Sequence, residues 1–250
     1  MRILVTFALD AEFAPWRKLR PFQKNKAANV DHFSAQVFGS QVDVLLTGVG
    51  AKGEWLDAVQ EMYDSEIDIC ISSGLAGGLR AEHQIGEILV AEKVLAGPRD
   101  ITAFSDASLV SSAVAAGAKR VSTFYTADRV ILHAEEKHAL GAFADAVEME
   151  SFGVLIESGM FAARTAGIRA ISDTAYEDLP LDFNKVTDGS GELSPARILG
   201  EVLGAPGSIP ALIRFGQRSK TAAESLAKFF ERFLPILVMD SNTTSIGSLR

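Results

Sequence analysis

The chain of 250 residues is poor in cysteine and histidine, with one cysteine and four histidines. Cys70 has no second cysteine to pair with and lies in the apolar run IDICISS, so we interpret it as the reduced core thiol of a cytoplasmic protein. The histidines lack the spacing of metal ligands. His133 and His138 have Glu135 and Glu136 between them, which favours a solvated helix face over a metal site.

Positive charge and long apolar runs are also scarce. The chain has 24 basic and 32 acidic side chains, a formal net charge of −8, which excludes the broad basic surface that binds nucleic acid. No apolar run approaches the ~20 residues that span a bilayer. The start of the chain, MRILVTFALDAEF, has acids directly after its apolar run and no cleavage-type site, so it predicts a strand and not a signal peptide.

Apolar residues make up 48% of the chain and alternate between strand-like and helix-like segments. We expect strands at 2–9, 31–39, 41–48, 67–74, 86–96, 119–127 and 168–175. We expect helices at 10–19, 51–65, 106–118, 136–144 and 151–166, with further helices starting at Ser194-Pro195 and Ser208-Ile209-Pro210. This order predicts a single α/β domain at 1–238, with a mixed, mostly parallel sheet covered by helices on both faces, and a disordered tail at 239–250.

Two glycine clusters follow predicted strands. The first, 48–53, matches G-x-G-x-x-G, but it comes after a hairpin and the next strand ends in ISSG without an acid for a ribose. We therefore interpret it as a tight turn and expect no nicotinamide or flavin cofactor. The second, 72–79 (SSGLAGGL), predicts a loop in which a ligand can approach the backbone.

Acids follow several strands at the edge where α/β sheets bind ligands. Asp10 and Glu12 follow the first strand, Glu148 and Glu150 lie in the segment DAVEME, and Asp173 follows IRAIS. Together they predict a carboxylate-lined pocket with few cationic partners. Such a pocket suits a substrate rich in hydroxyl groups and a reaction that develops positive charge.

Six segments occur in an order that resembles a known family: ILVTFALDAE, VLLTGVGAKG, IDICISSGLAGGL, GEILVAE, AVEMES and IRAISDTA. Together they are similar to the purine nucleoside phosphorylase/uridine phosphorylase superfamily, and most similar to its methylthioadenosine/S-adenosylhomocysteine nucleosidase branch. The resemblance implies a single α/β domain around a mixed, partly closed barrel and a homodimer or larger homo-oligomer. It implies a small-molecule nucleoside as substrate.

The resemblance also implies roles for individual residues. Glu150 hydrogen-bonds the ribose hydroxyls, Asp173 protonates purine N7, and Glu12 activates the attacking water. An acid is needed because a purine anion is a poor leaving group, and a carboxylate stabilises an oxocarbenium-like sugar. The resemblance also implies Glu148 as a substrate-binding residue. It lies on the same side as Glu150 only if the strand persists through residue 150; otherwise it supports other site residues or is structural. The remaining substrate-binding residues implied are Met149, Ser172, Val49, Gly74, Leu75, Ala76, Val130 and Ile131.

The nucleophile is predicted to be water. Phosphorylases of the family hold phosphate with an arginine just before the glycine loop, where this chain has Ser72 and Ser73, and Leu75 stands where a serine or threonine is common. Arg17 is the remaining candidate for a phosphate ligand, so phosphorolysis stays open as an alternative. A nucleoside-binding module without chemistry is a further alternative, but it would not need Glu12, Glu150 and Asp173 together.

The sequence does not determine the identity of the 5′ substituent of the nucleoside. The segment 172–186 (SDTAYEDLPLDFNKV) and the long C-terminal helix resemble bacterial relatives that act on adenosylhopane. That helix has apolar residues at helical spacing, which predicts packing on the sheet or on a partner subunit, with peripheral membrane contact as the alternative. Pro235 is expected to end or kink it. The apolar residues are Leu226, Phe229, Phe230, Phe233 and Leu234.

Overall fold

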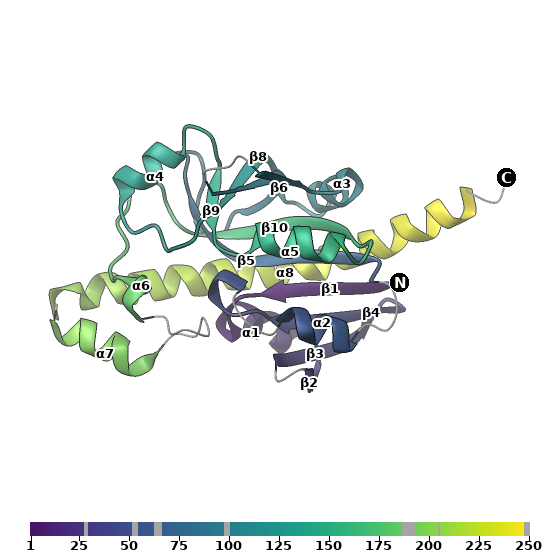
Figure 1. Ribbon diagram of the computed structural model, residues 1–250, viewed down its shortest axis with the longest axis horizontal. Coiled ribbons are helices and arrows are strands. Elements are labelled where there is room, and N and C mark those ends of the chain that lie inside the picture. Colours follow the sequence, from purple (N-terminus) through teal and green to yellow (C-terminus); the bar gives the residue numbers. More distant parts are fainter. Residues whose placement is uncertain are drawn as a thin grey trace.

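The computed structural model describes residues 1–27, 30–51, 55–62, 67–97, 101–186, 194–204 and 206–247. Within these ranges the chain forms one α/β domain around a ten-stranded sheet (Figure 1). The strands are β1 (Arg2–Phe7), β2 (Gln23–Ala27), β3 (Val30–Val37), β4 (Ser40–Leu46), β5 (Ile69–Gly78), β6 (Ile88–Ala96), β7 (Ile101–Phe104), β8 (Lys119–Thr126), β9 (Ala146–Glu148) and β10 (Arg164–Asp173). The helices are α1 (Asp10–Leu19), α2 (Trp55–Met62), α3 (Ala107–Ala115), α4 (Ala134–Leu140), α5 (Ser151–Gly159), α6 (Phe183–Val186), α7 (Pro195–Gly204) and α8 (Ile209–Gly247), with short 3₁₀ turns at Val49–Ala51 and Pro206–Ser208.

Part of the sheet closes into a barrel. The strand order is β10-β6-β8-β9-β5-β1-β4-β3-β2, and β10 also pairs with β5, so β5, β6, β8, β9 and β10 form a ring. Strands β1, β5 and β10 run parallel, as do β6, β8 and β9, whereas β10 is antiparallel to β6 and β9 is antiparallel to β5. The predicted mixed, partly closed barrel is confirmed. The carboxyl ends of β1 and β10 meet beside β5, which is where the predicted acids lie.

The second glycine cluster is not a loop, which corrects the prediction. Strand β5 continues to Gly78, and Gly74 to Gly77 pair with β10. Gly74 has a φ of +146°, and a Cβ there would lie 2.7 Å from Arg169 Nη1. A side chain at this position would therefore clash with a buried guanidinium, so the glycine makes room for that group.

The predicted hairpin between β3 and β4 is confirmed, with its turn one residue earlier than expected. Val37 pairs with Ser40, and Phe38 and Gly39 both have positive φ angles, 50° and 80°. Two such residues form the kind of turn whose twist matches the flanking strands. Strands β2 and β7 and the short helix α6 are not predicted by the sequence pattern.

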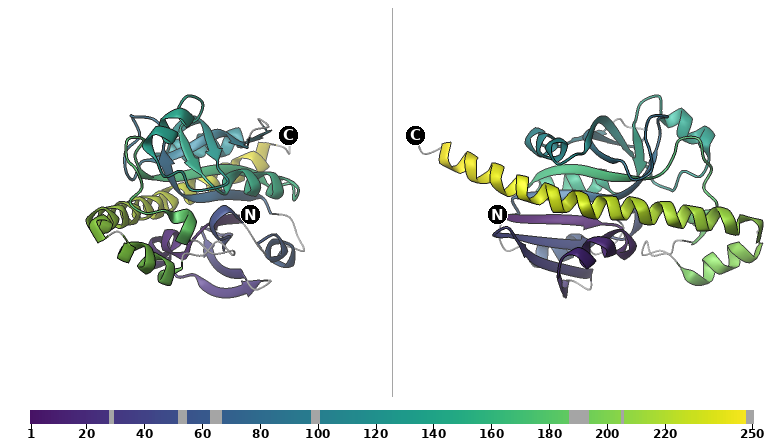
Figure 2. Two further views of the ribbon diagram at one scale, coloured as in Figure 1. Left: turned by 60° about the vertical axis from the view of Figure 1, so that its left-hand side comes forward. Right: turned by 180° about the vertical axis from the view of Figure 1, so that it is seen from behind.

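Helix α8 crosses the whole molecule along one side of the sheet (Figure 2). It contacts α1, α3 and β10. All five apolar residues singled out in the sequence are buried, with exposures of 1% or less, so packing on the sheet is confirmed and these side chains are not available to a membrane. The helix does not end at Pro235 and continues to Gly247 through most of the predicted tail; 248–250 lie outside the described residues.

In the part of the chain that the structure describes, no helix combines the length and apolar character needed to cross a membrane. Over the same residues, no group of three or more histidine, cysteine, aspartate or glutamate side chains is placed to hold a metal ion.

Candidate active site

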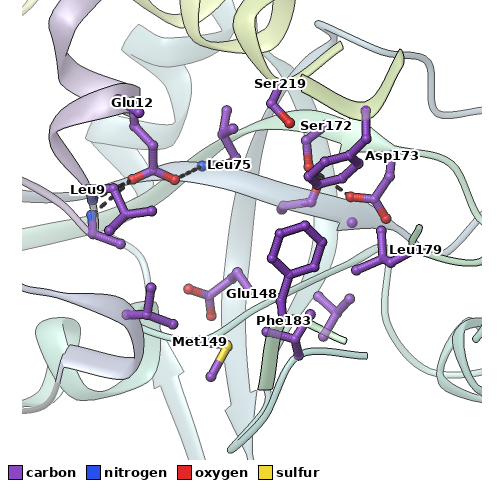
Figure 3. A pocket seen from close by; sticks show the side chains of 18 of the residues that line it. Leu9, Glu12, Leu75, Glu148, Met149, Ser172, Asp173, Leu179, Phe183 and Ser219 are labelled. Carbon is purple, nitrogen blue, oxygen red and sulfur yellow. Dashed lines mark hydrogen bonds between the residues drawn. The ribbon is translucent and has the colours of Figure 1, made fainter. Parts of the chain in front are cut away.

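A cavity of about 550 Å³ opens at the carboxyl ends of β1, β4, β8, β9 and β10 (Figure 3). Each of these strands is followed by a turn or helix whose first residues face the cavity. In Figure 3, Glu12 and Asp173 lie on opposite sides of it, with Glu148 and Met149 on the wall between them. The predicted site residues that line it are Glu12, Val49, Leu75, Ala76, Val130, Ile131, Glu148, Met149, Glu150, Ser172 and Asp173.

Gly74 is the predicted binding residue that does not line the cavity; it lies beneath, in β5, against Arg169 and Glu12. Asp10 and Arg17 also lie away from it. Arg17 Nη1 pairs with Asp10 Oδ1 at 2.7 Å, and its guanidinium lies over the rings of Phe13 and Phe33. Arg17 therefore does not fit the role of a phosphate ligand.

Glu12 is held rigidly in the first turn of α1. Its Oε2 accepts hydrogen bonds from the N–H groups of Ala8 and Leu9 at 3.0 and 3.2 Å, and its Oε1 accepts one from Leu75 N–H at 3.0 Å (Figure 3). Burial raises the pKa of Glu12 more than the Arg169 charge and these backbone bonds lower it. The carboxylate is thus fixed in direction and more basic than an ordinary glutamate.

Arg169, inside β10, is fully buried beneath the acids, and the sequence analysis missed it. Its Nη2 contacts Glu148 Oε2, and lies 3.3 Å from Glu150 Oε2 and 3.0 Å from Ser151 Oγ. The prediction of few cationic partners is therefore wrong. The available signal was an arginine inside an apolar strand, because a buried guanidinium needs acidic partners.

Two donors of Arg169, Nε and Nη1, have no hydrogen-bond partner in the described part of the chain. The point where a Cβ on Gly74 would sit lies 2.7 Å from Arg169 Nη1 and 3.1 Å from both carboxylate oxygens of Glu12. The Arg169 guanidinium and the Glu12 carboxylate therefore both lie close to Gly74, in the space that a larger residue would fill with its side chain.

Glu148 anchors the start of α5. Strand β9 ends at Glu148. Glu148 Oε2 accepts hydrogen bonds from the N–H groups of Glu150 and Ser151 at 2.9 and 2.7 Å. Burial would raise the pKa of Glu148, but the Arg169 charge and the hydrogen bonds from Thr126, Ser151 and Glu150 outweigh it and hold the pKa below its ordinary value. The strand ends before residue 150, and Glu148 nevertheless lines the same cavity as Glu150 while it holds the start of α5.

Glu150 precedes the first residue of α5 and points toward the turn after β4. Its Oε1 accepts a hydrogen bond from Gly50 N–H at 2.8 Å, so the short 3₁₀ turn at Val49–Ala51 orients a glutamate; the last residues of the first glycine cluster lie outside the described residues. Burial raises the pKa of Glu150 to about 7; the charges of Glu148 and Glu12 add to this, against the pull of Arg169 and the Gly50 bond. Glu150 can therefore exist in either protonation state near neutral pH.

Asp173 ends β10 and has both carboxylate oxygens engaged. Oδ1 accepts a hydrogen bond from Ser172 Oγ at 2.8 Å, and Oδ2 accepts one from Lys137 Nζ at 2.5 Å. Lys137, in α4, is fully buried and was not anticipated from the sequence. The residue spacing within this short helix gives no sign that its lysine faces the end of a strand 36 residues later in the chain.

The outer part of the cavity is mostly apolar. It is formed by α1, the segment after β10, α6 and the first half of α8. The rings of Phe183 and Phe215 lie 5.2 Å apart. The cations at the cavity wall are Arg129, which pairs with Glu136, and Lys220, whose side chain is 75% exposed. The apolar wall residues here include Pro15, Leu179, Phe183 and Phe215.

Known proteins share this chain's family pattern and fold. A family model described as the phosphorylase superfamily matches residues 2–203. The 5'-methylthioadenosine/S-adenosylhomocysteine nucleosidase of Marinomonas sp. is 25% identical over 216 residues, covering 76% of this chain and 94% of the relative. The aminodeoxyfutalosine nucleosidase of Campylobacter jejuni is 24% identical over 222 residues, covering 80% of this chain and 97% of the relative.

Two solved structures from Helicobacter pylori have a similar fold. One is a 5'-methylthioadenosine/S-adenosylhomocysteine nucleosidase with butyl-thio-DADMe-Immucillin-A, with a TM-score of 0.72, 18% identity, and coverage of 94% of this chain and 98% of that one. The other is a futalosine hydrolase with a TM-score of 0.72, 18% identity, and coverage of 94% and 97%. At these identities the likeness establishes the fold.

Proposed function

Because the chain belongs to the phosphorylase superfamily, we propose that it is a nucleosidase that hydrolyses the N-glycosidic bond of an adenosine-type nucleoside and releases adenine. One observation carries the proposal: Glu12, Glu150 and Asp173, from separate parts of the chain, line a single cavity. The relatives named as methylthioadenosine/S-adenosylhomocysteine and aminodeoxyfutalosine nucleosidases support it.

Asp173 is the acid for the leaving group. A purine leaves as a neutral base only if a ring nitrogen takes up a proton as the bond to the sugar breaks. Asp173 is 7% exposed, and Ser172 fixes one of its oxygens. It therefore presents a carboxyl group of defined direction to N7 of the bound purine.

Glu150 and Met149 contact the ribose in this proposal, and Glu12 acts on water. A carboxylate beside the sugar hydroxyls stabilises the positive charge of an oxocarbenium-like transition state. Glu12, held by three backbone N–H groups, accepts a proton from the attacking water. The nearby charge of Arg169 favours the ionised form of Glu12 that accepts this proton.

Phosphorolysis is the less favoured alternative because of the charges around Arg169. Its guanidinium is already compensated by Glu148, Glu150 and Glu12. A phosphate dianion in place of the water would meet these carboxylates at close range, and like charges repel strongly in a buried site. Ser72 and Ser73 add no positive charge.

The 5′ substituent that this cavity accepts is apolar in our proposal. The ribose 5′ side would face the outer wall formed by Pro15, Leu179, Phe183 and Phe215. A methylthio group, the homocysteine thioether and a larger hydrocarbon such as that of adenosylhopane all present apolar surface to such a wall.

The proposal includes a homo-oligomer in the cytoplasm. Exposed apolar side chains on β7, on α5 and directly after α5 support an interface between copies: Phe104 is 70% exposed and Met160 is 79% exposed, with Ile101 and Ile156 also exposed. Light scattering of the purified protein gives the mass in solution, and a monomer would contradict this part of the proposal.

Adenine release tests the activity itself. Purified protein is incubated with methylthioadenosine, S-adenosylhomocysteine and adenosine, and the free base is measured by chromatography. A nucleosidase releases adenine from at least one of them. A protein that binds these nucleosides in calorimetry and releases no base would instead be a binding module.

A further inference from the structure

Lys137 is a buried cation beside the site that the mechanism above does not use. Its side chain is 1% exposed, and Nζ donates to Asp173 Oδ2 at 2.5 Å. Nζ also donates to the carbonyl oxygens of Glu177 at 2.9 Å and of Thr174 at 3.2 Å. All three ammonium hydrogens therefore have acceptors, and the one charged partner is the acid that must protonate the base.

The chemistry at Asp173 requires a proton near neutral pH. A carboxylate must first receive a proton before it can give one to N7, so Asp173 needs a proton source beside it. The Lys137 ammonium is in direct contact with this carboxylate, so it can pass a proton to Asp173 while Asp173 passes one to N7.

We propose, on the basis of the nucleosidase function above, that Lys137 is a positioning residue that supplies Asp173 with the proton that passes to N7. The proton resides on Lys137 in the ion-paired form and on Asp173 in the neutral form. As the bond between C1′ and N9 breaks, its electron pair goes to the purine and N7 takes the proton from Asp173. This leaves an Asp173 carboxylate and a neutral Lys137 amine, which regains a proton from solvent; the proton of the attacking water goes to Glu12.

A purely structural role for Lys137 is the competing explanation, because it ties α4 to the segment after β10. That segment has other attachments, however. Asp178 Oδ1 accepts a hydrogen bond from Ala134 N–H at 2.7 Å, and Leu179 N–H donates to the Leu132 carbonyl at 2.8 Å. Arg218 of α8 pairs with Glu177 at 2.5 Å. The segment is thus held in place without Lys137, and a neutral side chain could fill a structural role equally well.

Two leaving groups separate the explanations. Adenine needs a proton as it leaves, whereas nitrophenolate from 4-nitrophenyl β-D-ribofuranoside leaves as a stable anion. We expect Lys137→Met to lower kcat for adenine release about 100-fold or more at pH 8 and to leave nitrophenolate release nearly unchanged. Asp173→Asn should give the same split. Lys228→Met, which removes an exposed lysine from α8, is the matched control and should change neither rate.

Equal losses on both substrates, or no loss on adenine release, would overturn the proposal. If Lys137→Met does not fold, Lys137→Gln keeps a hydrogen-bond donor toward Asp173 and the two carbonyls and is expected to show the same split. If the wild-type protein releases neither adenine nor nitrophenolate, the nucleosidase function itself fails, which is distinguishable from a failure of the Lys137 role.

Discussion

At the scale of single residues, the site is a balance of buried charges around Arg169. Glu12, Glu148 and Glu150 all lie close enough to stabilise its positive charge, and Glu148 takes the strongest contact. The other two glutamates have raised pKa values because burial penalises their ionised forms. Glu150, whose pKa is raised to about 7, can therefore accept and release a proton near neutral pH. The raised pKa of Glu12 makes its carboxylate a better base, as the proposed reaction requires.

Glu150→Gln should stabilise the protein at high pH. Burial raises the pKa of Glu150 from 4.5 to about 7, so between these values the folded state holds a proton that the unfolded state has lost. Stability therefore falls as pH rises from about 4.5 to 7, and above 7 the fold contains a buried carboxylate. Glutamine can still accept the Gly50 bond without this penalty, worth up to about 3 kcal/mol.

Urea unfolding of wild type and Glu150→Gln at pH 5 and pH 8 checks this. The variant should gain stability relative to wild type at pH 8 and gain little at pH 5. It should also have a lower kcat/KM for nucleosides, because the ribose loses its carboxylate. If Glu150→Gln does not change the affinity for a nucleoside analogue, the proposed contact between Glu150 and the ribose is wrong.

Glu12→Gln should lower the rate of hydrolysis by a factor of about 100 to 10,000, since an amide cannot take the proton of the attacking water. Asp10→Asn is the matched control: this neighbouring acid pairs with Arg17 away from the cavity and should retain full activity. Steady-state kinetics on methylthioadenosine distinguishes the two, and comparable losses in both variants would contradict the role of Glu12. Because Glu12 must be ionised to act as a base and its pKa is raised, the wild-type rate should fall as the pH is lowered, and the fall should begin above the usual glutamate range.

Asp173→Asn should abolish adenine release and retain binding, because an amide can hydrogen-bond N7 but cannot protonate it. Calorimetry with a nucleoside and turnover measured on the same preparation test both halves of the prediction. Turnover near that of wild type would remove Asp173 from the acid role.

At the scale of elements, sequence patterns located most strands and helices but missed those that depend on tertiary pairing. Strand β2, with the sequence QKNKA, lacks apolar alternation and exists because it pairs with β3 at the sheet edge. The run after Ser73 looks like a loop because of its glycines, yet it is a strand that closes the barrel and passes close to Arg169. The site acids follow recognisable strand ends and could be predicted. The roles of Arg169 and Lys137 depend on acidic partners distant in the sequence, so residue patterns did not indicate them.

The first part of helix α8 lines the cavity and a later part packs in the core, and one substitution in each part should separate these two roles. Phe230 is fully buried and stacks on Trp16 of α1 at 4.6 Å, so Phe230→Ala should cost about 3–5 kcal/mol of stability. Phe215 lines the outer cavity, so Phe215→Ala should raise KM for a nucleoside with an apolar 5′ group more than for adenosine. Chemical unfolding and kinetics of both variants give the comparison; a large stability loss at Phe215, or none at Phe230, would contradict it.

At the scale of the whole molecule, the alternation of strands and helices predicts an α/β domain, and the structure confirms it. Closure of the barrel depends on β10 pairing with both β5 and β6, which residue patterns alone do not indicate. The family resemblance supplied that expectation, and the match of the phosphorylase superfamily model to residues 2–203 confirms the family.

The sugar product of the reaction tests the central claim most directly. Wild-type protein is incubated with methylthioadenosine in buffers with and without inorganic phosphate, and the products are separated by mass spectrometry. We predict adenine and free methylthioribose in both buffers, at a rate that phosphate does not increase. Methylthioribose-1-phosphate as the product would show that phosphate is the nucleophile, and the absence of any free adenine from this or the other nucleosides would contradict the nucleosidase account.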